Sequence, residues 1–274
     1  MAVKTWWARR APAVALATVL ASACATIQPP PKPVTDVPSA GRFPHERLGL
    51  VLTKAVSPEG LVDYGVVSQE ETLLDEYLAE LARISPESHA HLFPTEADRL
   101  AYWINAHNAC ALRSVLRWNR PTRMTSIEGR FDHAKEFVLG GKKMSLLDIV
   151  NYLRGRFNDP RVHFVLVRAR RGGPPLSKEP FLPASLEQQL EAAARASVDD
   201  SRFVQWEPPS LEVRLSRVIL DYRGDFESVI SATVSGDPRL IAGLNRWRPA
   251  RRQLVANSVA PIPFDERLND ISNK

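Results

Sequence analysis

The chain has 274 residues, of which 44% are hydrophobic, and a formal net charge of +5 at pH 7. Its first 23 residues hold three of the 36 basic side chains and no acidic one, so the remainder carries 33 basic against 31 acidic residues, about +2. This balance argues against nucleic acid as a partner. The two cysteines and six histidines show no disulfide framework and no metal-ligand spacing, so we expect neither a metal nor another cofactor.

The amino-terminal segment has the layout of a secretory signal peptide. Three basic residues precede an apolar run that is too short to span a bilayer, and small residues follow. We predict a signal peptide over residues 1–23 and lipid attachment at Cys24, in a sequence that resembles the bacterial lipoprotein cleavage box. Residues 24–41 then form a proline-rich tether, and Ala25 indicates the periplasmic face of the outer membrane. The alternative is cleavage after Ala25, which would release a soluble secreted protein.

The remaining residues are predicted to form one α+β domain over 42–234 and a C-terminal extension over 235–274. Apolar periodicity, capping residues and breakers predict the following helices: Phe43–Val56, Glu70–Ile84, Thr95–Trp118, Ser145–Arg156 and Ser185–Ser197. Strands are predicted in a hairpin over Phe137–Met144, in a buried run over Asp159–Val167 and at Leu211–Leu215. The strands lack a βαβ rhythm, which favours a small, mostly antiparallel sheet around a central buried helix.

That central helix is Thr95–Trp118, whose start carries a side-chain cap formed by Thr95 with Asp98. Its apolar stripe is interrupted by Asn105 and Asn108, whose amides need specific partners if they are buried. One interpretation is that the two asparagines bind the backbone of a neighbouring loop. The other is that they line a pocket.

Several motifs appear in a fixed order along the chain: Gly60–Tyr64, Ala101–Ala109, Ser145–Ile149, Asp159–Phe164, Gly172–Leu176 and Asp225–Phe226. Their order and spacing resemble the domain of unknown function 547 family, from about Phe43 to Phe226. The family has no settled activity, and many of its bacterial members look like secreted proteins or lipoproteins.

The chain departs from that family at three positions. His107 stands where the family usually has tyrosine, and Arg168 and Gly173 stand where it usually has cysteines. If the family's loop cysteine is a nucleophile activated by the histidine at His163, this member lacks that mechanism. If the two cysteines form a disulfide in the family, this chain lacks that disulfide, and positions 168 and 173 should lie close together.

His163 is the main candidate for function. It is either a core histidine hydrogen-bonded to the asparagines of the central helix or a general base. We expect a pocket formed by Asn105, Asn108, His163, Gly173 and Pro174 beneath the diproline loop. The favoured function is a membrane-tethered envelope lipoprotein whose pocket binds a peptide, a cell-wall polymer or an envelope protein. The alternative is a cell-envelope hydrolase or transferase with His163 as general base and no identified nucleophile.

Overall fold

The computed structural model describes residues 41–230 and 234–273, so the predicted signal peptide, Cys24 and almost all of the tether lie outside the described residues. The helices of the first half are α1 (Glu46–Ala55), α2 (Tyr64–Gln69), α3 (Glu71–Arg83), α4 (Glu96–Arg117), α5 (Glu128–His133) and α6 (Leu146–Phe157). The second half contributes the 3₁₀ helix η3 (Pro160–Phe164), α7 (Leu186–Asp199), α8 (Arg217–Asp221), α9 (Arg223–Ser228) and α10 (Asp237–Asn245). The predicted α+β class is confirmed.

Helix α4 is the central buried helix that the sequence predicts. Its N-terminus carries a complete capping box, in which the Thr95 hydroxyl accepts from the Asp98 backbone N–H and the Asp98 carboxylate accepts from the Thr95 N–H. Both asparagines of its stripe are buried, and α3 and α6 pack against it. Helix α6 also begins with a capping box, which is formed by Ser145 and Asp148.

The strands are divided between two small sheets. β1 (Phe137–Leu139) and β2 (Lys142–Met144) form the predicted antiparallel hairpin, which packs on α3. β4 (Glu212–Leu215) pairs antiparallel with β3 (Val204–Gln205) and parallel with β5 (Ser258–Pro261). The parallel pairing brings residues that are far apart in sequence to the same sheet.

The predicted buried strand over Asp159–Val167 is wrong, because this segment forms η3. The Asp159 side chain accepts from the Arg161 N–H and caps the helix, and Pro160 occupies its first turn with a suitable φ. A short apolar run does not by itself distinguish a strand from a buried helical turn, and here the cap decides.

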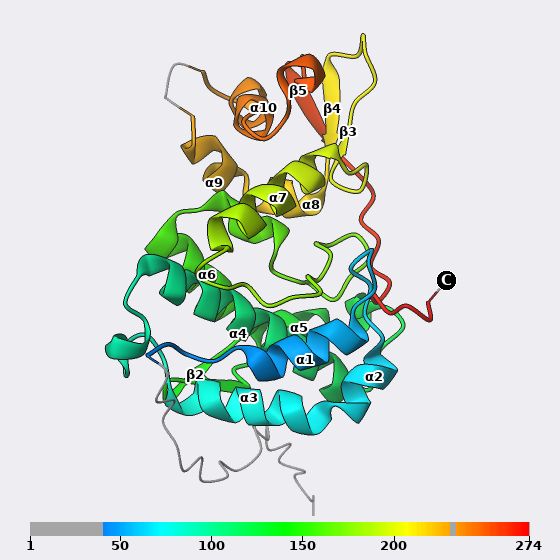
Figure 1. Ribbon diagram of the computed structural model, residues 1–274. Helices are drawn as coiled ribbons and strands as arrows, with labels where there is room; N and C mark the ends of the chain where they lie inside the picture. Colours follow the sequence, from blue (N-terminus) through cyan, green and yellow to red (C-terminus); the bar gives the residue numbers. More distant parts are fainter. Residues whose placement is uncertain (1–40, 231–233, 274) are drawn as a thin grey trace, which may run out of the picture.

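Two hydrophobic clusters meet at η3. The larger cluster surrounds α4, and Val162 belongs to it. The smaller one includes Phe164, Phe203 and Trp247 and lies among α7, α9, α10 and the three-stranded sheet. Figure 1 shows this second group of elements above the layer that contains α1, α3 and α4. Side chains of η3 therefore enter both clusters, and His163 lies between them in the sequence.

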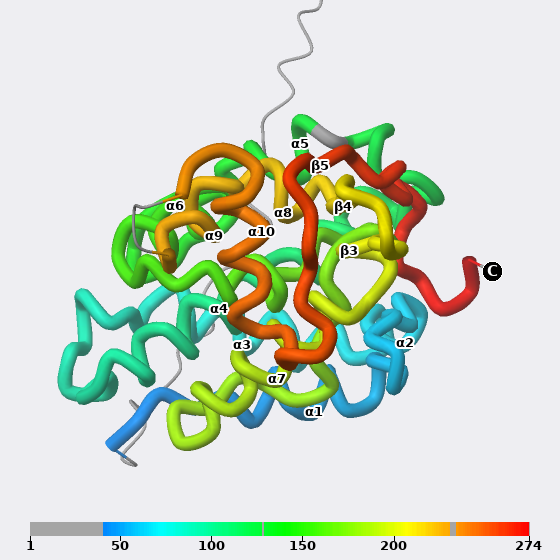
Figure 2. Tube along the Cα trace, turned by 90° about the horizontal axis from the view of Figure 1, so that it is seen from above, coloured from blue at the N-terminus to red at the C-terminus, as the bar shows by residue number. Residues whose placement is uncertain are grey.

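The last residues run back to the start of the domain. Asp270 pairs with Val62 in a parallel bridge, and the Tyr64 hydroxyl donates to the Asn269 side chain at 2.7 Å. The C-terminus therefore lies beside α2 in both views (Figures 1 and 2). Within the described ranges, 41–230 and 234–273, no helix combines the length and apolar character needed to cross a membrane.

Candidate functional site

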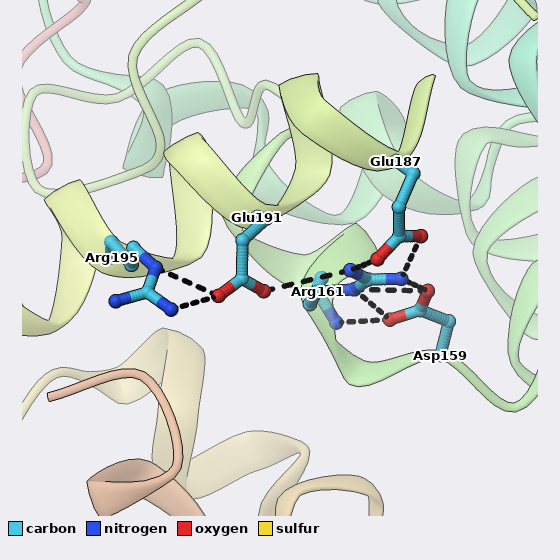
Figure 3. A network of polar contacts seen from close by, with 5 residues as sticks. All are labelled: Asp159, Arg161, Glu187, Glu191 and Arg195. Atoms are coloured by element: carbon cyan, nitrogen blue, oxygen red, sulfur yellow. Dashed lines mark hydrogen bonds and ion pairs between the residues drawn. The ribbon is translucent and has the colours of Figure 1, made fainter. Parts of the chain in front are cut away.

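A polar network fixes the short helix that carries His163. Arg161 donates to both oxygens of Asp159 and also to both oxygens of Glu187 on α7. Glu191, one turn further along α7, lies 3.7 Å from Arg161 and also pairs with Arg195 (Figure 3). The guanidinium of Arg161 thus ties η3 to α7 and limits the movement of the helix.

His163 is almost fully buried and forms a hydrogen bond with Asp225 on α9. Its Nε2 lies 2.7 Å from the Oδ2 atom of Asp225. Arg154 on α6 holds the same carboxylate from the other side, with Nε and Nη2 at 2.5 and 2.8 Å from its two oxygens. This bidentate pair orients the carboxylate, and the carboxylate in turn orients the imidazole.

The network determines which form each partner takes at neutral pH. Burial raises the pKa of the Asp225 carboxyl, but hydrogen bonds from Arg154 and His163 outweigh burial and hold that pKa well below its usual value. Burial lowers the pKa of His163, and the hydrogen bond to Asp225 opposes this shift only in part. Asp225 is therefore a carboxylate and His163 a neutral imidazole. Because a carboxylate only accepts, Nε2 of His163 carries the proton and Nδ1 carries the lone pair.

Tyr222 covers one face of the imidazole. The two rings stack with their centroids 4.0 Å apart and their planes at 14°. The guanidinium groups of Arg154 and Arg168 lie over the tyrosine ring, at 4.9 and 5.1 Å from its centroid. The stacking fixes the plane of the His163 ring, and the two arginines surround it with positive charge.

His163 lines a cavity of about 360 Å³ at the edge of the larger hydrophobic cluster. Polar residues in its wall include His107 from α4, Asp132 and His133 from α5, and Arg168 and Asp221. Apolar side chains from α5 and α6 complete it, among them Leu147. The cavity is large enough for a small polar molecule or a single residue of a longer ligand.

The two asparagines of α4 do not line this cavity, because their amides bind backbone. Asn105 accepts from the Phe181 N–H and donates to the Phe181 carbonyl, at 2.9 and 2.8 Å. Asn108 accepts from the Val167 N–H and donates to the Val165 carbonyl, both at 3.0 Å. The asparagines therefore fix the segments on either side of the diproline loop. His163 forms its hydrogen bond with Asp225 and not with them.

The diproline loop lies elsewhere. Gly173 and Pro174 are absent from the wall of the His163 cavity, whereas Pro175 lines a separate cavity of about 460 Å³ with residues of α7. A Cβ atom placed on Gly173 would lie 3.2 Å from the Cβ of Arg168. Disulfides join Cβ atoms about 3.5–4.5 Å apart. This proximity favours the interpretation that the family's cysteines at these two positions form a disulfide.

Comparison with known proteins gives a family match over part of the chain. Residues 93–197 match the family model described as "Protein of unknown function, DUF547". The match supports the DUF547 family for this segment. The DUF547 segment contains α4, α6, η3 and most of α7, and therefore His163, Arg154 and Arg168. Asp225 and Tyr222 lie outside it, as does the motif Gly60–Tyr64.

No curated protein and no solved structure matches the chain. The site must therefore be interpreted from its own geometry.

Sequence reasoning found His163 but missed the residues that orient it. Asp225 stands out in the sequence as an acidic-aromatic pair with Phe226 and as a possible acid or base, but nothing in the sequence connects it with His163, 62 positions earlier. Arg154 and Tyr222 carry no local signal at all. Cys110 is buried in α4, and burial raises the pKa of its thiol, which leaves it unsuited to act as a nucleophile.

Among the described residues, no three His, Cys, Asp or Glu side chains lie close enough together to hold a metal ion.

Proposed function

We propose that the protein is a lipid-anchored lipoprotein of the cell envelope whose folded domain binds a cell-wall fragment or a segment of an envelope protein in the His163 cavity. One observation carries the binding role. The Nε2–H of His163 donates to Asp225, which fixes the orientation of the ring. Its Nδ1 atom is unprotonated and can accept a hydrogen bond, and His163 is a residue of the cavity wall. Asn105 and Asn108 contribute indirectly, because they hold the adjacent backbone in place.

The anchor is supported by the sequence of the first 41 residues, with Cys24 as the site of lipid attachment and the proline-rich tether after it. Mass spectrometry of the mature amino-terminal peptide tests this part. An acylated cysteine at the amino-terminus is expected in the wild type, and export without acylation in C24A. A mature chain that begins after Ala25 would instead indicate a soluble secreted protein.

The binding role is tested with soluble cell-wall fragments from a muramidase digest and the purified full chain. We expect the digest to raise the thermal unfolding temperature of the wild type. Leu147→Trp should abolish this rise, because Leu147 is partly exposed on the cavity wall and a larger ring would fill the space. Leu182→Trp is the matched control, since Leu182 is 43% exposed and absent from this wall. An undiminished rise in L147W, or none in the wild type, would contradict the proposal.

A hydrolase is the second candidate, and the pairing of His163 with Asp225 favours it. A carboxylate that fixes the tautomer of a histidine is the usual partner of a general base, and Nδ1 would then take a proton from an attacking water molecule. Cleavage of the ligand separates the two functions, and His163→Gln tests the base, because a glutamine amide can still donate to Asp225 but cannot take up the proton. Release of new chain ends from wall fragments by the wild type, and its loss in H163Q, would favour hydrolysis over binding alone.

A further inference from the structure

A second histidine of the same cavity has a fixed tautomer. The Nδ1 atom of His107 lies 3.2 Å from the side-chain oxygen of Asn108. That oxygen also accepts from the Val167 N–H, and the Asn108 amide nitrogen donates to the Val165 carbonyl, so the orientation of the amide is determined. The Nδ1 of His107 must therefore be the protonated nitrogen, and its Nε2 carries the lone pair.

The two imidazoles of the cavity are both neutral acceptors. Burial lowers the pKa of His107 to about 4, and burial also lowers the pKa of His163. Only 4% of His107 and 2% of His163 are exposed, and each has one ring nitrogen without a hydrogen-bond partner among the residues that the structure describes. The free ring nitrogen of each histidine can therefore accept one hydrogen bond from a ligand that supplies N–H or O–H groups in the cavity.

Arg168 places a positive charge beside these two rings. It lines the same cavity, and its guanidinium lies 5.1 Å from the centroid of the Tyr222 ring that stacks on His163. Its ion pair with Asp221 is loose, at 3.8 Å, and Asp221 has a closer partner in Arg217, at 3.3 Å. Asp132, the other carboxylate of the wall, pairs with Arg170 at 3.6 Å. Arg217 also lines the cavity, but it pairs with both Asp221 and Glu266. Arg168 has the longer ion pair, at 3.8 Å, and is therefore the cation that we assign to an anionic ligand.

We propose that the cavity recognises a small carboxylate that also carries at least two hydroxyl or amide N–H groups, with Arg168 holding the carboxylate and the His107 Nε2 and His163 Nδ1 atoms accepting from the donors. This inference rests on the proposed binding function and names the ligand class. Among cell-wall components, N-acetylmuramic acid has this combination, since its lactyl group supplies the carboxylate and its ring the donors. N-acetylglucosamine is the same sugar without the carboxylate.

The test is calorimetric titration of the purified full chain with these two sugars. We expect N-acetylmuramic acid to bind at least about tenfold more tightly than N-acetylglucosamine, the factor that one charge-assisted hydrogen bond supplies. Arg168→Gln should remove this difference. His163→Gln and His107→Asn should each weaken N-acetylmuramic acid binding by about tenfold, because both keep the internal donor, toward Asp225 and Asn108 respectively, and lose the free acceptor.

His91→Gln is the control, because His91 is exposed on the 3₁₀ helix Ala90–Leu92 and absent from the cavity wall, so its change should leave affinity within about twofold. Equal affinity for the two sugars, no binding of N-acetylmuramic acid at millimolar concentrations, or unchanged affinity in both histidine variants would overturn the inference. If H107N does not fold, the test rests on the difference in affinity between the two sugars, measured in the wild type and in R168Q. If the muramidase digest raises the unfolding temperature of the wild type and not that of L147W, but the sugar titrations give a contrary result, the ligand class is wrong and the binding function stands.

Discussion

Asn108 offers the sharpest test of how the segment around His163 is held. Replacing it with alanine removes the partners of two buried backbone groups, the Val165 carbonyl and the Val167 N–H. Each such group costs about 1–3 kcal/mol when it is left unpaired, so we expect N108A to lower the free energy of unfolding by about 2–6 kcal/mol. That is a large fraction of the roughly 5–15 kcal/mol typical of a folded domain.

Urea unfolding followed by circular dichroism measures this loss, provided that the m-value is unchanged. Asn151→Ala is the control, since Asn151 is exposed on α6 and its loss should cost less than about 0.5 kcal/mol. Asn108→Asp should destabilise the protein as well, because it places an acceptor against the Val165 carbonyl. A loss below about 1 kcal/mol in N108A would show that Asn108 does not hold this backbone.

Three further predictions concern pH, covalent linkage and packing. The pKa values of His45 and His107 are lowered to about 4 by burial, so both are neutral in the folded state. The unfolded chain therefore takes up protons on these histidines below about pH 6.5, whereas the folded chain does so only near pH 4. The free energy of unfolding should be highest above about pH 6.5 and fall as the pH decreases toward 4, and in urea titrations H107N should lose less of it between pH 6.5 and 5. Exchanging both Arg168 and Gly173 for cysteine should produce a disulfide, seen as a thermal unfolding temperature that drops on reduction; two thiols that remain free under oxidising conditions would refute the geometry. Gly60→Ala should destabilise the protein by more than 1 kcal/mol in urea unfolding, because φ is +77° and the added Cβ would lie 2.3 Å from a side-chain atom of the diproline loop; an unchanged midpoint would contradict this.

The parts of the fold that follow from local chemistry could be predicted from the sequence. The capping boxes at Thr95 and Ser145, the hairpin with its paired glycines and the amphipathic helices all depend on residues within a few positions of one another. Residues 160–164 form η3 and not the predicted strand, because a capping residue and a proline outweigh a short apolar run. Asp159 followed by Pro160 is a helix start, and this signal was present in the sequence.

The candidate site depends on contacts that no local pattern contains. His163 meets Asp225 across 62 positions, and Arg154 reaches the same carboxylate across 71. Of the two interpretations of Asn105 and Asn108, the geometry favours binding of backbone over lining the cavity. The sequence places His107 on the stripe of α4 and marks it as a departure from the resembled family, but its position in the cavity depends on the packing of α4 against the segment around Val167.

The end of the chain joins three distant segments. Backbone hydrogen bonds connect Leu268 with Thr122, Asn269 with Ala169, and Ile271 with Val62. A nascent chain emerging from the ribosome or a translocation channel cannot form these bonds until residues 268–271 have emerged. The segments around Val62, Thr122 and Ala169 therefore lack these partners during most of synthesis, and a stop codon before position 268 would remove all three connections at once.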